Sequence, residues 1–107
     1  MAISKIKRGS AEFAILCVLA EERLHGYQIA QRIADRTAGE LRFTLASLYP
    51  MLYALERRGW IRGAWETKPG GRKRRHYKLT AAGNKQIAPL RREWSGFFRA
   101  IANACVR

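Results

Sequence analysis

The side chains with the most evident chemistry form a basic cluster around residue 70. Gly70 and Gly71 are followed by four consecutive cations, and Glu66 is the nearest acid. Arginine and lysine at this density neutralise phosphates, and paired glycines let a loop adapt to a surface. A solvated loop would carry the same residues, but the net charge of +13 favours a polyanion partner. We therefore predict phosphate contacts on nucleic acid, ahead of an acidic membrane surface, at Lys68, Arg72, Lys73, Arg74 and Arg75.

The sequence contains no residue pattern that indicates catalysis. The sequence has no paired carboxylates, no Ser/His/Asp set and no phosphate-binding glycine loop. Its 2 cysteines, Cys17 and Cys105, lie far apart in apolar stretches without metal-ligand spacing. The 2 histidines, His25 and His76, are either structural or a pH-sensitive switch. We predict no catalytic residue, no metal and no cofactor, and a protein that is not an enzyme.

The apolar stretches indicate a cytoplasmic protein. None reaches the ~18 residues of a membrane span, and acidic residues border the longest of them, "FAILCVLA". Reduced cysteines fit the cytoplasm, and DNA binding would associate the protein with the nucleoid. Residues 1–9 form a basic tail, which is either solvated or a second arm that reaches DNA.

Helical periodicity and capping residues predict three helices before the basic cluster. Ser10 can cap a helix through "AEFAILCVLAEE", which is apolar nearly all round. The segment "YQIAQRIADRT" is a one-sided helix, and Gly39 follows it as a stop signal. The third helix is expected from Thr44, its cap, to Arg58, with Gly59 after it.

The third helix has two contrasting faces. Its apolar stripe consists of Leu45, Leu48, Leu52 and Leu55. The opposite side and its flanks are small, hydroxylated or cationic, as expected of a helix that faces DNA. Pro50 either marks the first turn or bends the helix. The candidate DNA contacts from this helix are Thr44, Ala46, Ser47, Tyr49, Pro50, Tyr53 and Arg57.

The remaining segments predict a hairpin and a final helix. The runs "WIRGAWE" and "RHYKLT" alternate in polarity around the glycine turn. Thr80 can cap the last helix, although Gly83 and Pro89 weaken its first turns and place its effective start near Pro89. Its apolar stripe is more than a monomer leaves in water. The predicted dimer interface comprises Leu16, Ile87, Leu90, Trp94, Phe97, Phe98, Ile101 and Cys105.

Three helices, a two-stranded hairpin and one further helix make a mainly α winged helix-turn-helix with a C-terminal dimerisation helix. Residues 10–80 form the DNA-binding domain and residues 81–107 the dimerisation helix. The third helix would enter the major groove, and the basic wing would follow phosphates or enter the minor groove.

Three motifs resemble the PadR-type transcriptional regulators over nearly the whole chain. They are "HGYQI" at 25–29, "SLYPMLYALERRGWI" at 47–61 and "GGRKRRHYKLTAAG" at 70–83. The resemblance implies a homodimeric repressor on a palindromic operator, of the short branch in which a single C-terminal helix makes most of the dimer. One departure is Ala46, where the family usually has glycine, and the added methyl limits close approach of the backbone.

The resemblance also bears on individual residues. It implies that Tyr49 and Pro50 open the recognition helix, with the tyrosine hydroxyl on a phosphate. Tyr27 and Tyr49 are equally well explained as half-buried aromatic residues. Some relatives hold flat aromatic drugs against a tryptophan of the last helix, where this chain has Trp94; the alternative is a packed interface tryptophan.

Two functions follow from these observations. The first is a homodimeric repressor, relieved by a small planar effector, that prefers one operator over random DNA by ~10³ or more. The alternative is an architectural or nonspecific DNA-binding protein without an effector, which the high charge would also serve.

Overall fold

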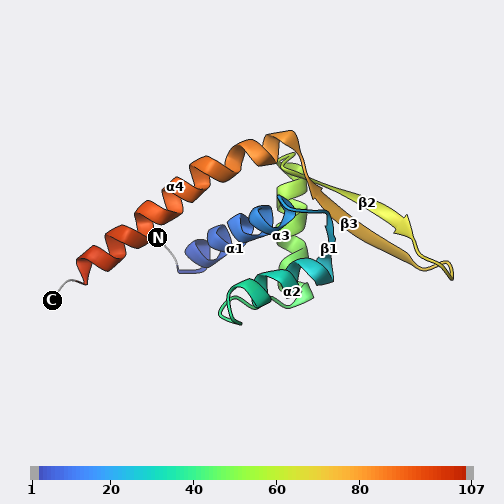
Figure 1. Ribbon diagram of the computed structural model, residues 1–107, viewed down its shortest axis with the longest axis horizontal. Coiled ribbons are helices and arrows are strands. Elements are labelled where there is room, and N and C mark those ends of the chain that lie inside the picture. The colour runs from blue at the N-terminus through green and yellow to red at the C-terminus, as the bar shows by residue number, and fades with distance from the viewer. Residues whose placement is uncertain (1–2, 106–107) are drawn as a thin grey trace.

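The computed structural model describes the backbone of residues 3–105 and the side chains of residues 8–105. A small helical body carries two projections, a β hairpin and the end of the last helix (Figure 1). The molecule measures 60 × 28 × 24 Å. The elements, in chain order, are α1 (Ile3–Leu19), β1 (Leu24–His25), α2 (Gly26–Arg36), α3 (Leu45–Arg57), β2 (Ile61–Thr67), β3 (Lys73–Leu79) and α4 (Ala81–Ala104). This arrangement confirms the predicted fold class, a mainly helical winged helix with a long C-terminal helix.

The core lies where α1, α2 and α3 meet the sheet. Ile15 of α1, Ile29 of α2 and Leu52 of α3 are fully buried there, as the apolar periodicity predicts. The leucine stripe of α3 differs from the prediction at one end. Leu45 is exposed because residues 44–47, the first turn of α3, are all exposed to solvent, and Met51 is buried in the core instead.

Threonine caps set the starts of α3 and α4. The Thr44 hydroxyl accepts a hydrogen bond from Ser47 N at 3.1 Å, and the Thr80 hydroxyl accepts one from Gly83 N at 3.0 Å. Each bond satisfies an amide that the first helical turn leaves without a partner. Gly59, directly after the cap of α3, has φ +77°, the left-handed conformation expected of a stop glycine. Both caps and this stop were predicted correctly.

Three local predictions were wrong. Ser10 is not a cap, because α1 begins at Ile3 and residues 3–9 continue the helix rather than forming a tail. α4 does not start near Pro89 but runs unbroken from Ala81. Gly83 does not interrupt that helix, and the close packing requires glycine there, because a Cβ would lie 2.0 Å from the Trp60 carbonyl oxygen. Pro50, left open by the sequence, stands in the second turn of α3.

The sheet has three antiparallel strands in the order β1-β3-β2, one more than predicted. β1 is 2 residues long, too short to produce an alternating pattern, and it pairs His25 with His76. β2 and β3 pair from Ile61 opposite Leu79 to Thr67 opposite Lys73. The turn between them closes through Lys68 N to Arg72 O at 2.6 Å, and Gly70 and Gly71 there have φ of +92° and +86°.

The apolar stripe of α4 divides into two parts. Near its start Ile87 is buried in the core of its own chain, and Leu90 packs against that core. Farther along, Phe98 and Ile101 are 55% and 48% exposed. The assignment of Leu16 and Ile87 to a dimer interface was therefore wrong, because Leu16 is 0% exposed within the single chain and both residues belong to its core.

Candidate nucleic-acid interface

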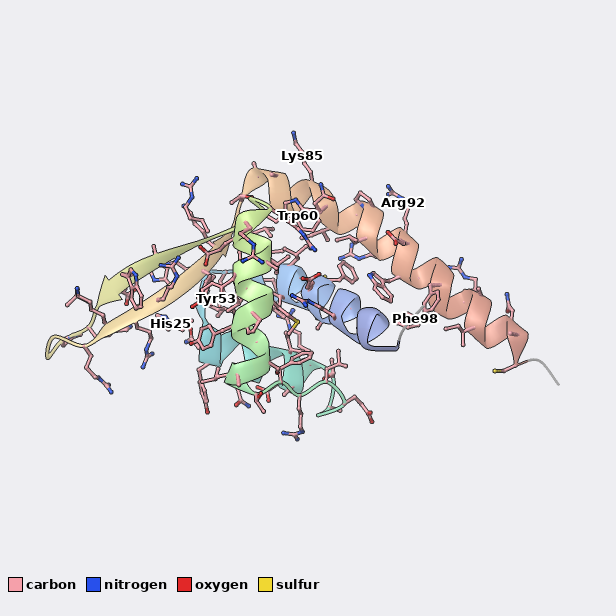
Figure 2. The ribbon with its side chains drawn as sticks, turned by 180° about the vertical axis from the view of Figure 1, so that it is seen from behind. His25, Tyr53, Trp60, Lys85, Arg92 and Phe98 are labelled. Atoms are coloured by element: carbon pink, nitrogen blue, oxygen red, sulfur yellow. The ribbon has the colours of Figure 1, made fainter. Side chains whose placement is uncertain are left out.

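A groove opens between the start of α2, the outer face of α3 and the wing formed by β2 and β3. Its volume is about 420 Å³. Five tyrosine and tryptophan rings line it, and they belong to Tyr27, Tyr49, Tyr53, Trp65 and Tyr77. Three cations line it from one strand of the wing, and they are Lys73, Arg74 and Arg75. Figure 2 shows His25 and Tyr53 on this side of the body and Phe98 far away on α4.

The outer face of α3 presents most of the residues predicted to contact DNA. The exposed ones are Thr44, Ala46, Ser47, Pro50, Tyr53 and Arg57. Tyr49 is only half exposed and packs against the start of α2, where a Cβ on Gly26 would lie 2.9 Å from its hydroxyl oxygen. Glycine at position 26 is therefore needed for this contact between the first and second helices of the helix-turn-helix.

The cations of the wing fall into two groups. Arg75 folds back over Gly63 toward α3 and donates a hydrogen bond to Glu56 Oε2 at 2.9 Å. Its guanidinium also lies 5.5 Å from the ring centre of Trp65. Within the described part of the chain, Arg72, Lys73 and Arg74 form no ion pair. The phosphate contact of Arg75 stays a prediction, and its guanidinium already binds a carboxylate of its own chain.

On the other face of the wing, Glu66 lies beside Lys68 and His76. Its carboxylate lies 2.8 Å from Lys68 Nζ and 3.0 Å from His76 Nδ1. The hydrogen bond from Lys68 lowers the pKa of Glu66, so the carboxylate stays charged in mildly acidic solution. Of the residues predicted to contact phosphate, Lys68 is thus already paired, although it stands at the edge of the exposed turn.

His25 connects this charged cluster to α2. Its ring centre lies 5.9 Å from that of His76, and its backbone amide donates to Gln28 Oε1 at 2.9 Å. Burial lowers the pKa of His25, and the charges of Arg74 and Lys68 lower it further. The imidazole is consequently neutral near pH 7.

Sequence reasoning missed the aromatic part of the groove. The sequence pattern predicts Trp65 only as one residue of an alternating strand, and it leaves Tyr27 open between packing and DNA contact. Both are 66% exposed and both line the groove. The available signal was register, since Trp65 stands directly opposite Arg75 across the hairpin and therefore shares its face.

A helix-turn-helix followed by a basic, exposed wing defines the class of winged-helix DNA-binding proteins. Residues 15–89 match the model of the transcriptional regulator PadR-like family, and the chain belongs to that family. A curated relative, an uncharacterized protein of Lysinibacillus sphaericus, is 32% identical over 95 residues, which cover 89% of this chain and 87% of the relative.

Solved structures share this fold over most or all of the chain. A transcriptional regulator from Clostridium thermocellum is 25% identical with a TM-score of 0.82, and the match covers 100% of both chains. Bacillus subtilis PadR, solved in complex with operator DNA, is 23% identical with a TM-score of 0.67 over 73% of this chain and 44% of that one. The family and these structures are transcriptional regulators, in agreement with the prediction that the chain is not an enzyme. No helix in the described part of the chain has the length and apolar character to cross a bilayer.

Proposed function

We propose that the protein is a homodimeric transcriptional repressor that binds a palindromic operator and acts in the cytoplasm on the nucleoid. The observation that carries the proposal is the exposed outer face of α3 beside Arg72, Lys73 and Arg74 of the wing, none of which has an acidic partner among the described residues. A helix of this kind fits the major groove, and unpaired cations bind phosphates without first giving up an ion pair. Arg57, exposed at the end of α3, is the proposed base contact.

The proposed dimer forms through the second half of α4. Trp94, Phe97 and Phe98 pack against one another there, edge-on or tilted, with ring centres 5.7 to 5.9 Å apart. This cluster continues the same stripe that α4 buries in its own core near its start, and within it Trp94 contacts Gly9 of α1 while Phe98 is 55% exposed. A second copy would cover the exposed part, which otherwise leaves large apolar side chains in water. The contributing residues are Leu90, Trp94, Phe97, Phe98, Ile101 and Cys105.

The experiment that tests the proposal is selection of bound duplexes from a random DNA pool at physiological salt. A dimer with two recognition helices should recover a two-fold motif with half-sites about one helical turn apart. A pool without a motif, bound strongly at low salt, would instead support the architectural protein without an effector.

We further propose that a small planar molecule relieves repression by binding at Trp94. The indole packs against Gly9 of α1, where a Cβ would lie 3.0 Å from the ring, and it remains partly exposed. A flat aromatic ligand could stack on such a ring between two copies of α4. Quenching of tryptophan fluorescence by a panel of planar aromatics, lost in Trp94→Phe, would test this binding directly.

A further inference from the structure

Trp65 is an exposed tryptophan on the wing, and the core gives no reason for it. Its side chain is 66% exposed, and it lies in the same groove as Tyr53 of α3, which is 53% exposed. Large aromatic side chains left in water on both walls of one groove indicate a surface that a partner covers.

The side chain of Arg75 holds the Trp65 ring in place. Arg75, the strand partner of Trp65, sets a guanidinium 5.5 Å from the ring centre, which is a cation–π contact. Arg75 is in turn fixed by Glu56 of α3, and the missing side chain of Gly63 makes room for it, because a Cβ there would lie 2.6 Å from Arg75 Nε. The orientation of Trp65 relative to the recognition helix is therefore determined by a chain of contacts that begins on that helix.

The charges around Trp65 complement a polyanion. Lys73 and Arg74 line the same groove, and within the described residues neither has an acidic partner. A DNA backbone alternates anionic phosphates with the apolar faces of deoxyriboses. A groove about 420 Å³ in volume that combines unpaired cations with exposed aromatic rings matches both parts of that repeat.

We propose that this groove seats one backbone strand of double-stranded DNA, with Trp65 packed on a deoxyribose and Lys73, which shares its face of the hairpin, on a neighbouring phosphate. Arg75 and Glu56 are positioning residues that set Trp65 against α3. The inference rests on the proposed DNA binding and adds to it a contact that the basic residues alone do not identify.

The test measures the accessibility of Trp65 to acrylamide with and without DNA. In Trp60→Phe/Trp94→Phe the emission comes from Trp65 alone, and the probe is a fluorescein-labelled random duplex of about 20 base pairs at low salt. Anisotropy of the label reports binding independently. Saturating duplex should lower the quenching constant of Trp65 at least ~3-fold. The control Trp65→Phe/Trp94→Phe reports Trp60, which lies outside the groove and should change far less.

The outcomes separate this inference from the proposed function. A duplex that binds while Trp65 stays equally quenchable would overturn the inference alone. A chain that binds no duplex would overturn both.

Variants in the otherwise native chain give a second measurement. Trp65→Ala should weaken duplex binding ~10-fold, whereas Trp65→Phe, which keeps an apolar ring, should lose no more than ~3-fold. Arg75→Lys keeps the charge but removes the planar stack. Placed in Trp60→Phe/Trp94→Phe, where only Trp65 emits, it should speed the decay of Trp65 fluorescence anisotropy in the free protein. Equal affinity of Trp65→Ala and the native chain would contradict the proposal.

Discussion

The wing and the second half of α4 both project from the helical body, but they expose opposite chemistry (Figure 1). The wing places the Trp65 ring over Arg75, which binds Glu56, and among the described residues Arg72, Lys73 and Arg74 form no ion pair. The second half of α4 instead exposes Phe98 and Ile101 along one stripe. The two projections are therefore suited to different partners, since cations without acidic partners attract a polyanion and an uncovered apolar stripe attracts another apolar surface.

The wing and α4 meet at one junction, their root, where hydrogen bonds join Thr80 to Trp60 and Gly59. The Trp60 carbonyl, at the start of the wing, accepts a hydrogen bond from Thr80 N at 3.0 Å, and the Thr80 hydroxyl donates to Gly59 O at 2.7 Å. Thr80 also caps α4. The angle between the wing and α4 is thus set by a few contacts around Trp60, Thr80 and Gly83. Variants in each projection and at the root can therefore distinguish their roles.

The largest effect is expected from Phe98→Asp on α4. A carboxylate in the proposed interface would have to be buried without a partner, so the protein should become monomeric in light scattering. Loss of bivalence should lower operator affinity by ~10³. Asn103→Asp is the matched control, because it adds the same charge on the opposite side of α4. A Phe98→Asp protein that stays dimeric would place the interface elsewhere.

The next largest effect is expected at the root, from Gly83→Ala. The added Cβ would meet the Trp60 carbonyl oxygen at 2.0 Å, so α4 must shift, and we expect a loss of about 3 kcal/mol in the free energy of unfolding. Gly96→Ala, in the same helix with nothing within 4 Å of the new Cβ, should gain up to about 1 kcal/mol. Urea denaturation measures both. Equal changes in the two variants would show that helix propensity, not packing on Trp60, determines the result.

A third prediction separates the two kinds of arginine on the wing. Arg75→Ala leaves Glu56 without its partner and should cost about 1 kcal/mol of unfolding free energy. Arg74→Ala should leave stability unchanged, weaken binding to every duplex several-fold and reduce the salt slope by about one. Thermal denaturation and anisotropy titrations at several salt concentrations check the pair. A destabilised Arg74→Ala protein would show that the division of the wing cations is wrong.

Local sequence signals were enough to predict most of the fold. Thr44, Gly59 and Thr80 act within a few residues of themselves, so their capping and stop roles could be read without tertiary knowledge. β1 was missed because its 2 residues become a strand only when β3 lies beside them. Gly83 was misjudged for a similar reason, since its role depends on a carbonyl that the chain brings near only after folding.

The sequence predicts which residues make up much of the candidate site, but not which of them pair with one another. The basic cluster and the outer face of α3 follow from residue types and period. Which arginine binds Glu56 and which stays free could not be read from "RKRR", because that depends on the face each residue takes in the hairpin. The same register places Trp65 opposite Arg75, and this position makes Trp65 a candidate DNA contact.

The smallest expected effect concerns the pH response of the cluster between α2 and the wing. Burial keeps the pKa of His25 below its ordinary value, with Arg74 and Lys68 adding to the shift, Glu66 opposing it and His76 facing the ring. The unfolded chain therefore binds a proton on His25 at a higher pH than the folded chain does.

Stability should be complete above about pH 6.5 and fall as the pH drops below it. His25→Asn, a residue that suits the N-cap position of α2 and does not titrate, should flatten this part of the profile in urea denaturation between pH 5 and 8. An unchanged profile would assign the acid sensitivity to other groups, and the wing would then keep its position beside α2 whatever the charge on His25.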